Sequence, residues 1–98
     1  MSQSIPGVAI FVARPGAEAE VEAMLKTLVF PSRAEAGVIH YTLYKDRDNP
    51  RRFVFTEAWQ DQSAFDRHLA SDHVSAAFPR IEGLLESSEV ILLDEVYV

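Results

Sequence analysis

Residues 38–59, VIHYTLYKDRDNPRRFVFTEAW, decide the fold, because they form two strand-like arms around one polar segment. Apolar and polar side chains alternate along each arm with the period of two that is typical of β-strands. The segment 46–50 between the arms consists of residue types that favour turns. The stretch therefore predicts a β-hairpin. Its first arm places Val38, His40, Thr42 and Tyr44 on one face, and its second arm places Phe53, Phe55, Glu57 and Trp59 on one face.

Before the hairpin, the continuous apolar run 7–13 predicts a strand that is covered on both faces. A helix is predicted next, because apolar residues recur at helical spacing after Ala17 and acidic residues lie at its start. We expect this helix to end by Phe30, since Pro31 cannot continue the hydrogen-bond ladder. Residues 32–36 would then form a linker.

After the hairpin, Asp61 is placed to accept backbone N–H groups at the start of a helix. One face of this helix carries Phe65, His68 and Leu69. The helical pattern resumes over residues 74–85, where Pro79 is expected to kink the helix or to begin a new turn. Residues 88–98, SEVILLDEVYV, predict a last strand.

The resulting order is β-α-β-β-α-β, which predicts an α+β protein with the ferredoxin-like split βαβ arrangement. In that fold one antiparallel sheet carries the helices on one face. The chain has 98 residues, enough for one domain, which we expect to span residues 1–98. Three of the four strands are apolar on both sides, so the uncovered face would expose a large apolar patch. We therefore expect a homodimer in which two sheets pack about a two-fold axis.

Composition narrows the classes of function. The formal net charge of -6 argues against a nucleic-acid partner, because a surface for nucleic acid would have to oppose the overall field. The absence of cysteine excludes disulfides, thiolate metal sites and a thiol nucleophile. The apolar run near the N-terminus is interrupted by Arg14 and Pro15, so it is too short for a signal segment or a membrane span. We expect a cytoplasmic protein without a membrane partner.

Residues 32–78 carry a series of motifs: a Glu-x-Gly segment, a tyrosine in the first arm, a Glu-x-Trp segment, and two histidines separated by a short polar segment. The positions concerned are Glu35, Gly37, Tyr41, Glu57, Trp59, His68 and His73. With these motifs the chain resembles the antibiotic biosynthesis monooxygenase family, which includes quinol monooxygenase-like proteins. The resemblance implies the ferredoxin-like fold over almost the whole chain.

Several activities are compatible with this resemblance. Monooxygenases of the family are described as needing no metal, flavin or haem, because the deprotonated aromatic substrate itself donates electrons to dioxygen. The resemblance thus implies a small quinol or phenolic substrate, an aromatic pocket, a base and no cofactor. An isomerase of a small phosphorylated hydroxy-ketone would add a phosphate site, for which only Arg47, Arg51 and Arg52 qualify. A dimeric domain that binds an aromatic or carbonyl compound without converting it explains the aromatic face equally well.

Glu57 and His68 are the candidate catalytic residues. Strand alternation places Glu57 between Phe55 and Trp59, where burial would raise the pKa of a carboxyl group and suit it to proton transfer. Alternatively, Glu57 accepts hydrogen bonds and only fixes the architecture. His68 lies on the core side of its helix, so it is a candidate base or proton shuttle, with Glu57 as its orienter or as an alternative base. A core histidine bonded to the backbone is the alternative interpretation.

Further candidates for substrate contact are Trp59, Phe65, His73, Tyr44 and Phe55. Core packing is the other interpretation of the aromatic ones. On an unbroken helix His73 would lie about 140° from His68, so the two do not have the spacing of a helical metal pair, and we expect no metal. The haem-degrading branch of the family fits poorly, because the first strand lacks asparagine and the axial position falls on Phe78. We expect Glu57 and His68 to open onto one pocket between the sheet and the helices.

Overall fold

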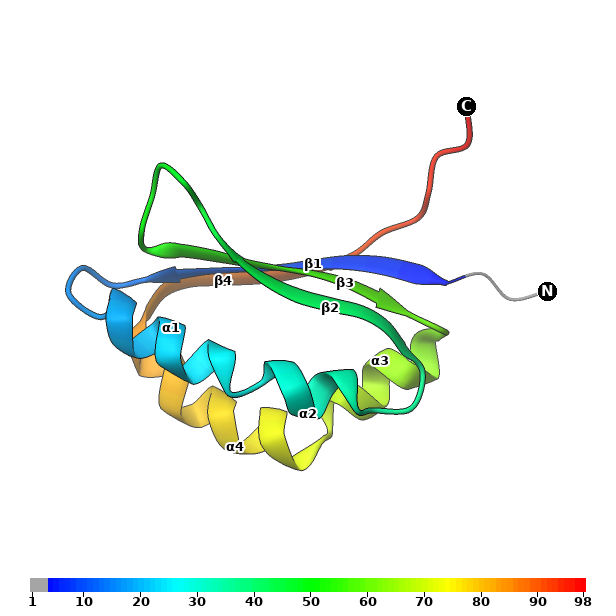
Figure 1. Ribbon diagram of the computed structural model, residues 1–98, viewed down its shortest axis with the longest axis horizontal. Helices are drawn as coiled ribbons and strands as arrows, with labels where there is room; N and C mark the ends of the chain where they lie inside the picture. Colours follow the sequence, from blue (N-terminus) through cyan, green and yellow to red (C-terminus); the bar gives the residue numbers. More distant parts are fainter. Residues whose placement is uncertain (1–3) are drawn as a thin grey trace.

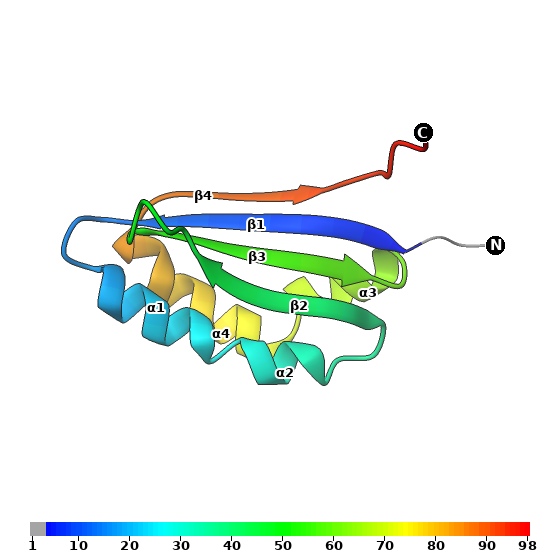
Figure 2. The same cartoon turned by 45° about the horizontal axis from the view of Figure 1, so that its top comes forward.

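The structure is a computed structural model that describes residues 4–98. The described residues form one four-stranded antiparallel sheet with the helices on one face (Figures 1 and 2). In chain order the elements are β1 (Ile5–Ala13), α1 (Glu18–Lys26), α2 (Val29–Arg33), β2 (Val38–Lys45), β3 (Arg52–Trp59), α3 (Gln62–Leu69), α4 (Asp72–Ile81), a 3-10 turn (Glu82–Leu84) and β4 (Leu85–Leu92). The strand order across the sheet is β2-β3-β1-β4. The ferredoxin-like α+β fold predicted from the sequence is thereby confirmed.

The predicted hairpin forms, but one position departs from simple alternation. β2 pairs antiparallel with β3, and the register shifts between Val38 and His40. Ile39, between them, is 59% exposed, while Val38 packs against the core. The prediction that Val38 shares a face with His40 is therefore wrong, because a β-bulge inserts one residue between them.

The helix-covered face of the sheet holds the core. Strand alternation places Phe53, Phe55, Glu57 and Trp59 on this face, as predicted, and all four are buried. They pack with apolar side chains of the other strands and of the helices, including Ala9, Phe11, Tyr41, Val21, Leu25, Leu28 and Ile81. Each buried aromatic side chain removes on the order of 150–250 Å² from water, so these rings supply a large part of the driving force for folding.

The first helical region contains two helices instead of one. α1 is followed by the short helix α2, and Pro31 lies inside α2. α1 ends at Lys26, so the prediction that it ends by Phe30 is confirmed, but the sequence did not predict that a second helix follows. Pro31 is tolerated in α2 because it occupies the first turn, where its missing N–H is not needed for an intrahelical bond. The predicted linker 32–36 is partly helical. Its last residues run from the C-terminal end of α2 toward α3.

The second helical region divides at Ala70 and Ser71, before Pro79 is reached. Asp61 caps α3 as predicted, since its Oδ1 accepts a backbone N–H of the first turn at 2.9 Å. Ser71 caps α4 in the same way at 3.4 Å, and α4 continues through Pro79. The prediction that Pro79 begins a new turn is wrong, because Ser71 already provides a capped helix start earlier in the chain.

β4 starts earlier than predicted, at Leu85, and ends at Leu92. Residues 93–98, which the sequence assigned to this strand, have no regular secondary structure. They leave the sheet on the side away from the helices (Figures 1 and 2). None of the helices in the described part of the chain has the length and apolar character needed to cross a membrane.

The face of the sheet without helices is less apolar than the sequence indicated. Within residues 4–98, β1 alone is apolar on both sides, with Val8, Ile10 and Val12 directed away from the helices. The other strands add polar as well as apolar side chains to this face, namely Val54, Thr56, Ala58, His40, Thr42, Tyr44, Ser87, Glu89 and Ile91. The expectation of three strands that are apolar on both sides is therefore wrong, and the apolar part of the open face is centred on β1.

Candidate active site

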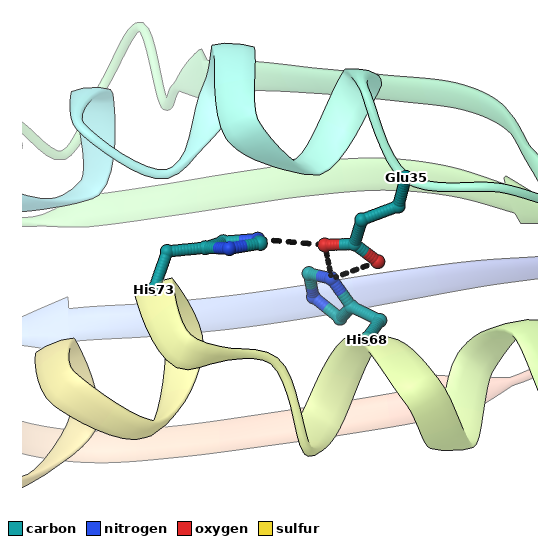
Figure 3. Close-up of side chains that lie close together, drawn as sticks. All are labelled: Glu35, His68 and His73. Atoms are coloured by element: carbon teal, nitrogen blue, oxygen red, sulfur yellow. Dashed lines mark hydrogen bonds and ion pairs between the residues drawn. The ribbon is translucent and has the colours of Figure 1, made fainter.

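A carboxylate and two histidines from separate parts of the chain meet where α2, α3 and α4 converge (Figure 3). Oε2 of Glu35 lies 2.9 Å from Nδ1 of His68 and 2.6 Å from Nε2 of His73. Its other oxygen, Oε1, lies 3.2 Å from Nδ1 of His68. An ionised carboxylate only accepts hydrogen bonds, so both ring nitrogens donate to it. We call these three residues the Glu35 cluster.

The loop after α2 carries Glu35 to this position. The N–H of Glu35 donates to the carbonyl of Ser32 at 3.1 Å, which extends the turn of α2. Gly37 then adopts a φ of +87°, and a Cβ there would lie 2.6 Å from the Cβ of Ala64 in α3. Glycine satisfies both constraints, so the loop packs directly against the helix that carries His68.

The break between α3 and α4 brings the two histidines together. His68 lies in the last turn of α3, and His73 lies in the first turn of α4. The separation of about 140° expected for an unbroken helix does not apply, because the chain changes direction at Ala70 and Ser71. The two ring centroids are 6.1 Å apart, close enough for both rings to reach one carboxylate.

Two serines complete the surroundings of His73. The Oγ atoms of Ser32 and Ser71 lie 3.2 and 3.3 Å from its Nε2. Ser71 Oγ also donates to the carbonyl of His68 at 2.6 Å. Ser32 is fully buried, and burial raises the pKa of the nearby Tyr41 above its usual value. The hydrogen-bond network therefore extends from α4 to α2.

The ring of His68 packs between aromatic side chains and keeps one nitrogen free. Its centroid lies 5.4 Å from the ring of Tyr41 and 4.6 Å from that of Trp59. Glu35 engages Nδ1, and Nε2 makes no hydrogen bond to the described residues. No fully buried side-chain nitrogen or oxygen in residues 4–98 lacks a partner, so Nε2 faces open space.

A cavity of about 30 Å³ lies next to His68, between the sheet and the helices. His68 and Glu57 both line it, as expected from the sequence. Most of the wall is apolar and consists of Ala9, Phe11, Leu28, Tyr41, Phe55, Phe65, Val74 and Phe78. Leu69 and Val90, which are 46% and 43% exposed, mark its mouth between α3 and the edge of β4. The cavity has room for a water molecule, whereas one that holds benzene is on the order of 150 Å³.

Glu57 is a buried carboxyl group among apolar side chains. Burial raises the pKa of Glu57, and the hydrogen bond that Trp59 Nε1 donates to its Oε1 at 3.1 Å opposes part of this effect. β1 passes close by at Gly7, where a Cβ would come 3.3 Å from Oε1. No hydrogen bond joins Glu57 to His68 among the described contacts. The carboxylate that contacts His68 is therefore Glu35. The expectation that Glu57 orients His68 is wrong, and its alternative role as a base stays a prediction.

The remaining candidates for substrate contact lie in different places. Phe55 and Phe65 line the cavity beside His68 and Glu57. Trp59 is fully buried and contributes no wall to the cavity. Tyr44 alternates with the core-facing residues of β2 and is directed away from the helices, with 52% of it exposed. His73 lines a separate groove between α1 and α4.

Ser32, Glu35 and Ser71 were not identified as site residues from the sequence. For Glu35 one signal existed, because it belongs to the Glu-x-Gly motif. The serines gave no signal beyond their polar character, and their contacts with His73 depend on how three helices converge.

The Glu35 cluster is also the group of side chains in residues 4–98 that could hold a metal ion, since its three donor atoms lie within 4.8 Å of one another. Both histidine nitrogens, however, approach the same oxygen, at 2.9 and 2.6 Å. Ligands placed about 2.0–2.1 Å from a tetrahedral metal are about 3.3 Å apart. The spacing in the cluster is therefore that of hydrogen bonds.

Comparison with known proteins identifies the family. The sequence profile described as antibiotic biosynthesis monooxygenase matches residues 8–80. The chain belongs to this family. All three residues of the Glu35 cluster, and Glu57, lie within the matched part of the antibiotic biosynthesis monooxygenase domain.

Two curated relatives of this monooxygenase-family chain are each 33% identical to it. One is an uncharacterized protein of Synechocystis, matched over 60 residues, which are 61% of this chain and 41% of that protein. The other carries the name "Putative monooxygenase Rv0793", comes from Mycobacterium tuberculosis, and is matched over 73 residues, which are 74% of this chain and 71% of that protein. The chain thus spans less than half the length of the Synechocystis relative.

Solved structures share the fold over the whole chain. PA3566 of Pseudomonas aeruginosa superimposes with a TM-score of 0.93 at 34% identity, covering 99% of this chain and 98% of that one. SnoaB of Streptomyces nogalater, described as a cofactor-independent oxygenase, superimposes with a TM-score of 0.83 at 25% identity, covering 99% and 97%.

Proposed function

We propose that this protein is a monooxygenase that oxidises a small quinol or phenolic aromatic with dioxygen and uses no metal, flavin or haem. The observation that carries the proposal is the position of His68, which lines an apolar cavity while Glu35 holds its Nδ1. Membership of the family and the description of SnoaB as a cofactor-independent oxygenase support the same class of reaction.

His68 is the base in this proposal. A carboxylate that accepts the Nδ1–H fixes the tautomer in which Nε2 carries a lone pair, and it stabilises the imidazolium that forms when Nε2 takes a proton. A phenolic hydroxyl in the cavity gives its proton to Nε2 and becomes an electron-rich phenolate. The apolar walls exclude water and strengthen the interaction between the two charges.

The phenolate supplies the electrons for the oxidation. A ring carbon forms a bond to dioxygen, and the resulting peroxide takes the proton that His68 holds. Loss of the ring hydrogen as a proton and cleavage of the O–O bond then leave a carbonyl on the ring and release water. A phenol and one dioxygen thus give a quinone and one water without an external reductant. Glu57, whose pKa burial raises, lines the same cavity and in its protonated form donates a hydrogen bond to the peroxide.

The cavity must widen before a ring can enter. Its volume of about 30 Å³ is well below the order of 150 Å³ that a benzene-sized ligand occupies. Leu69 and Val90 flank the mouth, and Leu28 and Phe78 form part of the inner wall. In the proposed reaction these side chains move when the substrate binds, as gating side chains do in many enzymes.

We also propose a homodimer formed through the open face of the sheet. Val8, Ile10 and Val12 lie partly exposed at its centre, and residues 93–98 extend on the same side with Val96 83% exposed. A second copy would cover both features and remove their apolar surface from water. Sedimentation at micromolar concentration should show a dimer, and a stable single-chain particle would contradict this assembly. The cytoplasm is the location we expect.

The isomerase alternative lacks support near the cavity. Arg52 begins β3 and Trp59 ends it, so the two are about 23 Å apart at about 3.3 Å per residue. Arg52 pairs with Asp46, and the neighbouring Arg51 pairs with Glu86. A phosphate held by these arginines would lie at the opposite end of the sheet from His68.

Oxygen uptake with small quinols and naphthols tests the proposed activity. The purified protein should consume dioxygen, and His68→Ala should lower the rate about 100-fold or more, because a positioned base contributes about 10²–10⁴-fold. His40→Ala is the matched control, since His40 lies on the open face, where it contacts Thr56 at 2.7 Å. Binding of quinols without oxygen uptake would indicate the non-catalytic binding domain instead. Unchanged uptake in His68→Ala would reject the assignment of the base.

A further inference from the structure

We propose that Glu35 couples the two histidines of its cluster, so that a proton taken up by His68 in the cavity is matched by a proton released from His73 to the groove between α1 and α4. The coupling depends only on these three side chains. Its part in catalysis rests on the proposed function. His73 is thereby a positioning residue that acts on the base through Glu35.

The two histidines face different spaces. His68 is 5% exposed and lines the internal cavity. The side chain of His73 is 22% exposed and lines the groove between α1 and α4, together with Glu20 and Arg80. This groove has a volume of about 550 Å³, far larger than the cavity. His73 can therefore exchange protons with water at a place that a substrate in the cavity does not block.

One carboxylate oxygen joins the two rings. Oε2 of Glu35 accepts from His68 at 2.9 Å and from His73 at 2.6 Å, and the ring centroids are 6.1 Å apart. When one ring becomes an imidazolium, the carboxylate stabilises its charge. A second imidazolium would then face a like charge across the cluster without a second anion. The cluster therefore favours one positive charge at a time.

The other groups around the cluster do not supply a second anion. Glu57 on β3 and Tyr41 on β2 are near His68, and burial favours the uncharged form of both by raising their pKa. The hydroxyls of two serines surround Nε2 of His73. Glu20 and Arg80, which share its groove, carry opposite charges. Within residues 4–98, Glu35 is the carboxylate that contacts both rings.

In the proposed reaction, the two histidines regain their starting protonation states within one catalytic cycle. The substrate hydroxyl gives its proton to Nε2 of His68, and a charged His73 gives the proton of its Nδ1 to water in the groove. The positive charge beside Glu35 thus moves from one ring to the other. When His68 passes its proton to the peroxide, His73 takes up a proton from the groove again. The base can accept charge in this way although the substrate closes the cavity to water.

NMR titration of the imidazole groups tests the coupling without any substrate. In the wild-type protein we expect His68 and His73 to titrate as an interacting pair with two macroscopic steps. His73→Gln retains an N–H donor beside Glu35 but cannot become charged. In this variant the proton affinity of His68 should rise about tenfold, which moves its midpoint up by about one pH unit. His40→Gln, on the open face of the sheet, is the matched control and should leave both midpoints unchanged.

The same midpoint for His68 in the wild type and in His73→Gln would overturn the coupling. Titration of neither histidine would also overturn it, because a metal ion held by the cluster would keep both rings neutral. Oxygen uptake gives a second readout: the pH at which the rate rises should move up by about one unit in His73→Gln, since the base must be neutral to act. Coupled titration without oxygen uptake would support the pair and reject the monooxygenase activity.

Discussion

The two carboxylates nearest to His68, Glu35 and Glu57, lie in regions that give the same chemical group different properties. Glu35 lies in a loop among three helices and accepts hydrogen bonds from two histidines. Glu57 lies on a strand among aromatic rings, accepts one hydrogen bond from Trp59, and has its pKa raised by burial. The first region can hold a base in one orientation, and the second can present an acid to the same cavity. Environment, more than residue type, thus separates the two proposed roles.

Among the substitutions that compare the Glu35 region with the Glu57 region, removal of Glu35 should have the largest effect on the reaction rate and on stability. Glu35→Ala leaves the buried Nδ1–H of His68 without an acceptor, so oxygen uptake should fall about 100-fold or more. The free energy of unfolding should fall by about 1–3 kcal/mol for the same reason. Oxygen-electrode rates and urea unfolding measure the two effects.

Glu35→Gln is the matched control, because it keeps the size of the side chain and an acceptor oxygen but removes the charge. We expect it to recover most of the stability and little of the rate. Wild-type rates in both variants would show that His68 needs no carboxylate, which contradicts the orienting role of Glu35.

Glu57→Gln tests the Glu57 region and should have the next largest effect on the reaction rate. The amide oxygen still accepts the Trp59 N–H, while the acidic O–H is replaced by an amide N–H, which is a weaker donor, so the rate should fall about 10- to 100-fold. A smaller decrease than in Glu35→Ala would agree with a supporting acid, and an unchanged rate would show that the reaction needs no acidic proton from Glu57.

The stability of Glu57→Gln should also depend on pH in a defined direction. Because the pKa of Glu57 is raised above its ordinary value of 4.5, the folded state keeps a proton at pH values where the unfolded chain has lost it. The wild-type protein is therefore destabilised through this group as the pH rises above 4.5, until the folded-state pKa is passed. Thermal unfolding across this range should show a smaller loss for Glu57→Gln. Parallel profiles for the two proteins would contradict a raised pKa.

The Glu57 region was largely predictable from the sequence, and the Glu35 region was not. Alternation along β3 is a local rule, so it placed Phe55, Glu57 and Trp59 correctly on one face. The Glu35 cluster depends on where helices begin and end. Pro31 was accommodated inside α2, and the second helical region broke at Ser71, because capping and tertiary packing outweighed the proline signals.

Two further features required the structure for a similar reason. The bulge at Ile39 changes the face on which Val38 lies, and no turn residue marks it in the sequence. The size of the cavity depends on how closely the side chains of four strands and the helices pack. The pocket was predicted from its polar residues, but its volume was not, since packing density is a property of the assembled core.

Trp59→Phe should have a smaller effect and tests the link between Trp59 and Glu57. It removes the N–H that donates to Oε1 at 3.1 Å and should lower the free energy of unfolding by about 1–2 kcal/mol. A double-mutant cycle with Glu57→Ala, which removes the acceptor oxygen, should give a coupling energy of about 0.5–1.5 kcal/mol, because the two side chains share one hydrogen bond. Strictly additive effects would mean that the tryptophan only fills space.

Leu69→Ala should have the smallest effect on stability and affects only the mouth of the cavity. Leu69 is 46% exposed, so the free energy of unfolding should change by less than about 1 kcal/mol. A wider mouth should lower the KM for a bicyclic naphthol more than for a monocyclic quinol. Leu93→Ala, at a residue that is 40% exposed and is not one of those that line the cavity, is the control and should leave both KM values unchanged. Equal KM values for Leu69→Ala and the wild type would place substrate entry elsewhere.

A crystal structure with a bound naphthol tests most directly whether His68, held by Glu35, is the base. We predict the hydroxyl oxygen of the naphthol about 2.6–3.2 Å from Nε2 of His68, with Nδ1 still bonded to Glu35 and the cavity widened toward Leu69 and Val90. A naphthol bound in the groove between α1 and α4, with no contact to Nε2 of His68, would contradict the assignment of His68 as the base.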